Sequence, residues 1–204
     1  MAAQNSIRRP LKSRNTAWAA GLARRLANAG VRPNQISLAG FAAAGAAALC
    51  LLRPSYLAAA ALIQLRLLCN LMDGMVAVEG GLRSKSGEIY NDLPDRISDA
   101  LILVAAGYSI SWPVHARELG WTAALLAILT AYVRTLGAAA GLPPDFGGPM
   151  AKPQRMAVMT AACLLSLFDP RSMAMALLIV IAGSSWTAIL RVRRIVRQLE
   201  GRLP

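Results

Sequence analysis

Long uncharged apolar runs alternate along this chain with short segments rich in charge, proline and glycine. Two of these runs, residues 34–52 and 172–190, each extend for 19 residues without a charged side chain. A helix of that length, rising 1.5 Å per residue, crosses a hydrocarbon core of about 30 Å. The pattern therefore predicts an all-α, polytopic membrane protein.

The breaks between the apolar runs divide the chain into six predicted transmembrane helices. Each break contains proline, glycine or charged residues, as in Arg53-Pro54-Ser55. The fifth span is the least regular, since its uncharged part covers only residues 156–168. The predicted spans are residues 34–52, 55–78, 88–112, 119–141, 153–168 and 172–192.

A basic segment precedes the first span. Trp18, Leu22 and Leu26 recur at helical spacing, while two arginines fall elsewhere on the helix. This pattern predicts an interfacial amphipathic helix, with an ordinary basic tail as the alternative interpretation. We expect three parts: a cytoplasmic basic and amphipathic segment (1–33), a six-helix transmembrane domain (34–192) and a basic cytoplasmic tail (193–204).

The distribution of charge along the chain predicts how the chain is oriented in the membrane. The sequence has 22 Lys and Arg against 10 Asp and Glu, a net charge of +12, although only 16% of residues are charged. On a soluble protein this excess would suggest nucleic acid. Here 16 of the 22 basic residues fall in the two terminal segments and in the loops after the second and fourth spans. This asymmetry predicts a multi-pass protein of a bacterial inner membrane with both termini cytoplasmic, and no nucleic-acid partner.

Polar residues at membrane depth in spans two and three indicate a functional site. An ionised group near the bilayer centre costs about 2.5–3.5 kcal/mol, so such residues are functional candidates by default. Arg66, Asn70 and Asp73 share one face of span two, and Asn91 and Asp95 share one face of span three. Two antiparallel helices joined by a short loop can point these side chains at one another.

The chemistry of this cluster favours a divalent cation and a phosphate. Oxygen donors without His or Cys suit Mg²⁺ or Mn²⁺. Paired divalent ions recur in phosphoryl transfer because they clamp the phosphate oxygens. The alternative interpretation is a set of structural salt bridges, for instance Asp92 with Arg96 at i, i+4, and both Asp92 and Asp99 fit that role better than a catalytic one.

Two spaced segments carry a family resemblance. Residues 70–77 read NLMDGMVA and residues 87–95 read GEIYNDLPD. Together they resemble the signature of the CDP-alcohol phosphotransferase family, which runs DxxDGxxAR, about eight residues, then GxxxDxxxD. Residues 32–37, RPNQIS, are similar to the TPNxIT segment that precedes the first helix of the family.

The resemblance implies an enzyme. Family members have six transmembrane helices and form homodimers. They use two divalent ions to transfer a phosphatidyl or other substituted phosphate group from a CDP-alcohol, such as CDP-diacylglycerol, to an acceptor alcohol, with release of CMP, in phospholipid biosynthesis. By position, Asn70, Asp73, Asn91 and Asp95 correspond to the metal ligands. Asp95 also corresponds to the general base.

The predicted substrate contacts come partly from the family resemblance and partly from the charge and position of basic residues. Gly74 and Ser84 match positions that contact the CDP moiety. Lys152 and Arg155 flank a proline at a helix start and predict a cradle for an anionic headgroup or acceptor phosphate, unless they only mark the cytoplasmic side. The predicted substrate-binding residues are Asn34, Gln35, Ile36, Ser37, Gly74, Ala77, Ser84, Arg134, Lys152 and Arg155.

Three positions depart from the family signature. Asn70 and Asn91 stand where the family has aspartates, and Val78 stands where it has arginine. The four ligand positions therefore carry a charge of −2 instead of −4. Three interpretations are open. The chain binds metal more weakly than the family does, or it binds a single ion, or a further ligand comes from Glu79, Glu88 or Asp92.

Two other functions are open on the sequence. A non-catalytic lipid- or nucleotide-binding membrane protein derived from this family would explain the two neutral replacements. A cation transporter would use Asp73, Asp95 and Asp99 as an intramembrane relay. The spacing of the signature gives the transporter no support, and measuring CMP release separates the non-catalytic relative from an enzyme; we expect a transferase.

Overall fold

The computed structural model describes residues 16–82 and 87–201, and this part of the chain consists of seven helices without a strand. Each of the six apolar runs forms one helix, which confirms the all-α prediction. The last helix continues past residue 192, where the sequence analysis ended the transmembrane domain. The helices are α1 (Ala17–Asn28), α2 (Pro33–Leu52), α3 (Tyr56–Glu79), α4 (Gly87–Tyr108), α5 (Ala116–Ala139), α6 (Lys152–Leu165) and α7 (Arg171–Leu199).

Local sequence explains where the helices nearest the site begin and end. Pro33 occupies the first turn of α2, where its missing N–H costs no hydrogen bond, and the Gln35 side chain accepts the backbone N–H of Arg32 at 2.9 Å. After α3 the chain turns at Gly81, whose φ of +64° favours glycine. Local sequence thus determines where α2 begins and where α3 ends.

Four of the described helices, α2, α3, α5 and α7, are long and apolar enough to cross a membrane. The remaining three differ for separate reasons: α1 has only 12 residues, α4 carries several charged residues, and α6 has only 14 residues, about 21 Å of helix. Large apolar side chains such as Leu49, Leu57, Leu125 and Leu178 are exposed on the outside of the bundle. An apolar exterior around a helical bundle is typical of a multi-pass membrane protein.

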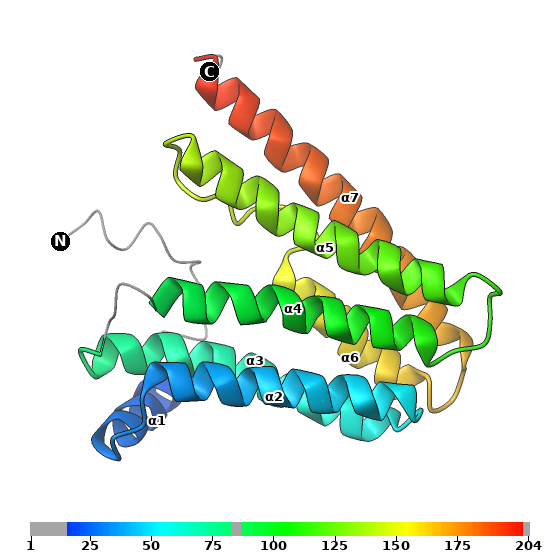
Figure 1. Ribbon diagram of the computed structural model, residues 1–204, viewed down its shortest axis with the longest axis horizontal. Coiled ribbons are helices and arrows are strands. Elements are labelled where there is room, and N and C mark those ends of the chain that lie inside the picture. Colours follow the sequence, from blue (N-terminus) through cyan, green and yellow to red (C-terminus); the bar gives the residue numbers. More distant parts are fainter. Residues whose placement is uncertain (1–15, 83–86, 202–204) are drawn as a thin grey trace.

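Small residues let the helices around the site pack closely. Helix α2 lies beside both α3 and α4 (Figure 1). At the crossing with α3, a Cβ added to Gly40 would stand 2.9 Å from Cβ of Cys69. Gly107 of α4 and Gly120 of α5 face each other in the same way. Close backbone approach at such positions is how membrane helices gain packing energy.

The short helix α1 packs against α3. Its buried residues Ala19 and Ala23 belong to a small apolar cluster with Met72 and Val76, whereas Trp18 is 56% exposed. The sequence correctly predicted a helix here. Leu22 and Leu26 of the predicted apolar stripe pack against this cluster, so the interfacial amphipathic character of α1 and its placement on a membrane surface stay predictions.

The start of α2, the end of α3 and the start of α4 lie at the same end of the bundle (Figure 1). The signature residues of α3 and α4 are in these terminal turns. The topology therefore gathers residues far apart in the sequence at one end, close to the loop between α3 and α4.

Candidate active site

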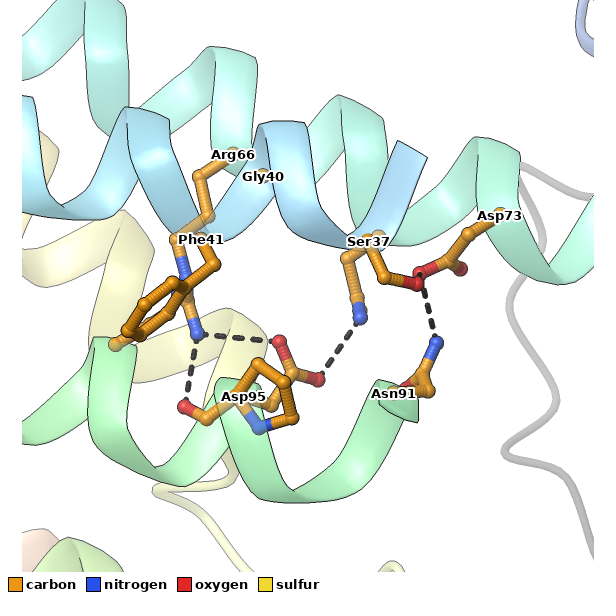
Figure 2. Close-up of a pocket in the computed structure, with 10 residues that line it drawn as sticks. Ser37, Gly40, Phe41, Arg66, Asp73, Asn91 and Asp95 are labelled. Atoms are coloured by element: carbon orange, nitrogen blue, oxygen red, sulfur yellow. Dashed lines mark hydrogen bonds and ion pairs between the residues drawn. The ribbon is translucent and has the colours of Figure 1, made fainter. Parts of the chain in front are cut away.

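A polar pocket opens between α2, α3 and α4 (Figure 2). Helix α3 supplies polar side chains from one wall, α4 supplies them from the opposite wall, and α2 covers the side. The pocket contains all four predicted metal-ligand positions. Its lining residues are Ser37, Gly40, Phe41, Arg66, Asn70, Asp73, Asn91, Pro94, Asp95 and Ser98.

Two hydrogen bonds join the α3 and α4 walls. The amide nitrogen Nδ2 of Asn70 donates to Oδ2 of Asp95 at 2.8 Å, and Nδ2 of Asn91 donates to Oδ2 of Asp73 at 2.8 Å. Each asparagine therefore pairs with the aspartate of the opposite helix. This arrangement confirms that the polar faces of spans two and three point at each other.

Asp73 is buried, and its side-chain hydrogen-bond donors are neutral. Its side chain is 3% exposed, and Oδ2 accepts hydrogen bonds from Ser37 Oγ at 2.7 Å and from Asn91. Its other oxygen, Oδ1, is buried without a hydrogen-bond partner among the described residues. A buried carboxylate oxygen left in this state is costly, which indicates that a cation or a donor from a ligand completes it.

Asp95 lies among cations. Its Oδ2 accepts from Asn70 and from Nζ of Lys152, and its Oδ1 lies 3.4 Å from Nη2 of Arg66. The Asp95 side chain is 14% exposed. Both oxygens of Asp95 are thus engaged, Oδ2 by short contacts and Oδ1 only by a long one.

A second ion-pair network lies one turn further along α4. Asp99 is 2% exposed and joins Nη2 of Arg66 at 2.6 Å to Nη2 of Arg155 at 2.8 Å. Arg155 also donates to Thr130 Oγ1 and to the carbonyl of Met150. This network ties α3, α4 and α6 together, so Asp99 has the structural role that the sequence favoured for it.

Asp92 forms a third, more exposed cluster. Its carboxylate pairs with Arg96 at 2.7 Å, the i, i+4 salt bridge expected from the sequence, and with Arg134 of α5 at 2.8 Å. The Asp92 side chain is 46% exposed. It lies outside the pocket lining and is no substitute for Asn91 as a pocket ligand.

The structure separates the residues predicted at the start of α2. Ser37 reaches the pocket and donates to Asp73, whereas Ile36 is buried in the apolar cluster between α1 and α3. Asn34 and Gln35 are exposed at the first turn of the helix. Among these four, Ser37 is the residue with a hydrogen bond to a predicted metal ligand in the described part of the chain.

The remaining predicted substrate residues are dispersed. On α3, Ala77 is buried and Gly74 is half-buried, and Ser84 lies outside the described residues. Lys152 and Arg155 of α6 and Arg134 of α5 do not converge on one cradle, because each pairs with a different carboxylate. The carboxylates are Asp95, Asp99 and Asp92, respectively.

Several residues near the site carry no chemical signal in the sequence. Gly40, Phe41, Pro94 and Ser98 line the pocket because of helix packing, which a motif does not report. Arg191 of α7 donates to the carbonyls of Gly147 and Thr130 at 2.9 and 2.6 Å, and so holds the segment that precedes α6. In the sequence, Arg191 is one of several arginines that follow the last apolar run, and nothing distinguishes it from the others.

The donor set fits a divalent cation on one side of the pocket. In the described part of the chain no three His, Cys, Asp or Glu side chains gather around one point, so an ion here depends on two carboxylates and on amide oxygens. The unpartnered Oδ1 of Asp73 is the donor that such an ion would complete. Carboxylate and amide oxygens are ligands that Mg²⁺ and Mn²⁺ accept.

Comparison with known proteins shows which family the chain belongs to. The family model described as CDP-alcohol phosphatidyltransferase matches residues 31–187, which include the start of α2, all four signature positions and most of α7. The chain belongs to the CDP-alcohol phosphatidyltransferase family. It is accordingly a transferase of phospholipid biosynthesis, as the resemblance implied.

The phosphatidylinositol phosphate synthase of Mycobacterium tuberculosis is 26% identical over 183 residues, covering 85% of this chain and 83% of the relative. Its crystal structure with CDP-DAG bound superposes with a TM-score of 0.77 at 23% identity and covers 87% of this chain and 92% of that one. The structure of the same synthase with manganese and citrate gives a TM-score of 0.77, covering 87% and 88%. These matches establish a shared fold.

Proposed function

We propose that this protein transfers a phosphatidyl group from CDP-diacylglycerol to an acceptor alcohol and releases CMP. The observation that carries the proposal is a pocket with two opposed carboxylates, one of which has a buried oxygen without a partner. The relative whose structure contains CDP-DAG supports the choice of donor. The acyl chains would stay in the bilayer while the diphosphate enters the pocket.

The pocket offers matching groups for a metal-bound phosphate. Mg²⁺ or Mn²⁺, as one or two ions held by Asn70, Asp73, Asn91 and Asp95, would polarise the phosphate and neutralise charge on the leaving CMP. The relative solved with manganese supports this choice. Arg66 adds a donor set, because its Nε and Nη1 are buried without partners among the described residues. Guanidinium groups suit phosphate oxygens.

Asp95 is the proposed general base. Its Oδ1, with only the 3.4 Å contact to Arg66, is the oxygen left to accept the proton of the acceptor hydroxyl. As that proton leaves, the hydroxyl oxygen forms a bond to the phosphorus that bears the diacylglycerol. The bond from this phosphorus to the CMP oxygen breaks, and CMP departs.

The other substrate contacts are proposals of the same kind. Ser37 would orient Asp73, and Gly74 and Ala77 would leave room for the CDP moiety beside α3. The start of α2 (Asn34–Ser37) and Ser84 would lie near the nucleotide. Lys152, beside Asp95, and Arg134, beside the exposed Asp92, would supply positive charge toward the acceptor, while Arg155, buried on Asp99, would hold α6 in place.

We also propose a membrane arrangement. Helices α2 to α7 would be the six crossings, α1 would lie at the interface, and both termini would face the cytoplasm of a bacterial inner membrane, where CMP is released. The chain would act as a homodimer surrounded by membrane lipids. The Lys and Arg excess of the terminal segments supports this orientation.

The test is CMP release by purified protein. The protein in detergent is incubated with CDP-diacylglycerol, Mg²⁺ or Mn²⁺, and a panel of acceptors that includes glycerol 3-phosphate, inositol phosphate, inositol and serine. We expect CMP with at least one acceptor, and none after EDTA treatment. Absence of CMP with every acceptor and metal, in protein that still binds CDP-diacylglycerol, would instead support the non-catalytic alternative.

A further inference from the structure

The two aspartates of the pocket have different electrostatic surroundings. Around Asp73, no Lys, Arg or His nitrogen of the described residues lies within 4.0 Å of the carboxylate, and its donors are the neutral Ser37 and Asn91. Around Asp95, two positively charged groups lie within that distance, on Lys152 and Arg66. A divalent ion therefore meets a carboxylate without a direct cationic partner at Asp73 and one that is already ion-paired at Asp95.

Lys152 is held at Asp95 by its own helix. It is the first residue of α6, and Arg155 anchors the same turn through Asp99, Thr130 and the carbonyl of Met150. The Lys152 side chain is 15% exposed, so most of it is enclosed by the protein. Its ammonium is consequently a fixed charge of the site and no mobile surface group.

The two asparagines lead to the same difference between the Asp73 side and the Asp95 side of the pocket. Asn70 and Asn91 carry no charge, which leaves −2 on the four positions expected to hold metal. Lys152 already offsets one of these charges at Asp95. A second divalent ion on Oδ2 of Asp95 would share that oxygen with the ammonium of Lys152, and like charges at such separations repel strongly.

We propose that this chain binds a single divalent ion, on the Asp73 side of the pocket, and that the ammonium of Lys152 supplies the positive charge on the Asp95 side. This inference rests on the proposed function. It assigns Lys152 to the pocket itself, as a positioning residue that fixes and neutralises Asp95. It also explains why neutral residues at positions 70 and 91 are compatible with a working site.

The stoichiometry of Mn²⁺ tests the proposal without reference to turnover. The EDTA-treated protein is titrated with Mn²⁺ in the presence of CDP-diacylglycerol, and free Mn²⁺ is measured by electron paramagnetic resonance. We expect one bound ion per wild-type chain. We expect two in the double variant Asn70→Asp with Asn91→Asp, and a tighter second ion when Lys152→Gln is added to it.

Asn28→Asp is the control for the chemical change itself, because it makes one of the same Asn-to-Asp replacements, and so adds one negative charge, at the exposed last residue of α1. It should bind one ion. Two ions, or none, in the wild-type protein would overturn the inference, and this result does not depend on whether the variants fold. CMP release measured in parallel separates the two proposals: turnover with two bound ions contradicts only the inference, whereas one bound ion without turnover for any acceptor contradicts only the proposed function.

Discussion

Asp95 and Asp99 lie one turn apart on α4, and both contact Nη2 of Arg66, yet their surroundings differ. Asp99 is 2% exposed and forms short ion pairs with Arg66 and Arg155. Asp95 lines the pocket, is 14% exposed, and has one oxygen with only a long contact. Two aspartates on the same helix face therefore have different surroundings: Asp99 is enclosed by a buried ion-pair network, whereas Asp95 borders the pocket and is available for the proposed chemistry.

The largest effect is expected for Asp95→Asn. The amide preserves the size of the side chain but removes the proton acceptor, so CMP release should fall about 10²–10⁴-fold. The melting temperature in detergent should fall less than that of Asp99→Ala, because the amide oxygen can still accept hydrogen bonds from Asn70 and Lys152. Wild-type turnover in this variant would exclude Asp95 as the base.

Asp99→Ala should act on stability instead. It leaves the guanidinium groups of Arg66 and Arg155 buried without their carboxylate, and removing one partner of a buried ion pair costs about 3–5 kcal/mol. Thermal unfolding in detergent should show a clear loss. If Asp99→Ala melted like the wild-type protein, the two aspartates would not differ as described.

Ser37→Ala tests whether the hydrogen bond from Ser37 prepares Asp73 for metal binding. Ser37 Oγ donates to Oδ2 of Asp73 at 2.7 Å, and loss of a hydrogen bond that orients a metal ligand weakens affinity about 10–100-fold. A Mn²⁺ titration measures the change. Ser109→Ala at the far end of α4 is the control, since its hydroxyl contacts only the carbonyl of Ala106 in this part of the chain. Equal Mn²⁺ affinity in Ser37→Ala and Ser109→Ala would exclude a role of Ser37 in metal binding.

The smallest effect is expected for Asp92→Asn. This carboxylate is 46% exposed, so solvent screens its pairs with Arg96 and Arg134. Pairs of this kind contribute about 0–1 kcal/mol, and the melting temperature should change little. A loss as large as that of Asp99→Ala would show that exposure does not distinguish these two aspartates.

The sequence predicted the helices and the pairing of the two polar faces because both follow from periodicity. Apolar runs mark α2 to α7, four of which are long and apolar enough to cross a membrane, and the spacing of Asn70 with Asp73 and of Asn91 with Asp95 places each pair on one helix face. Such patterns are local in the chain, so they can be read without coordinates.

The basic residues could not be assigned in the same way. Lys152 and Arg155 are three residues apart on α6, yet one contacts Asp95 in the pocket and the other is buried on Asp99. Which carboxylate each cation meets depends on how α6 lies against α3 and α4, and this is set by tertiary packing. The sequence therefore indicated positive charges near phosphate without showing that each has an internal partner.

CMP release after metal removal and readdition tests the central claim most directly. The wild-type protein is treated with EDTA, supplied with CDP-diacylglycerol and the acceptor panel, and titrated with Mn²⁺ beside Asp73→Ala. We predict that CMP release returns with Mn²⁺ in the wild-type protein and does not return in Asp73→Ala. CMP release that persists in EDTA, or that responds to Mn²⁺ equally in Asp73→Ala, would contradict a metal-dependent transferase centred on this pocket.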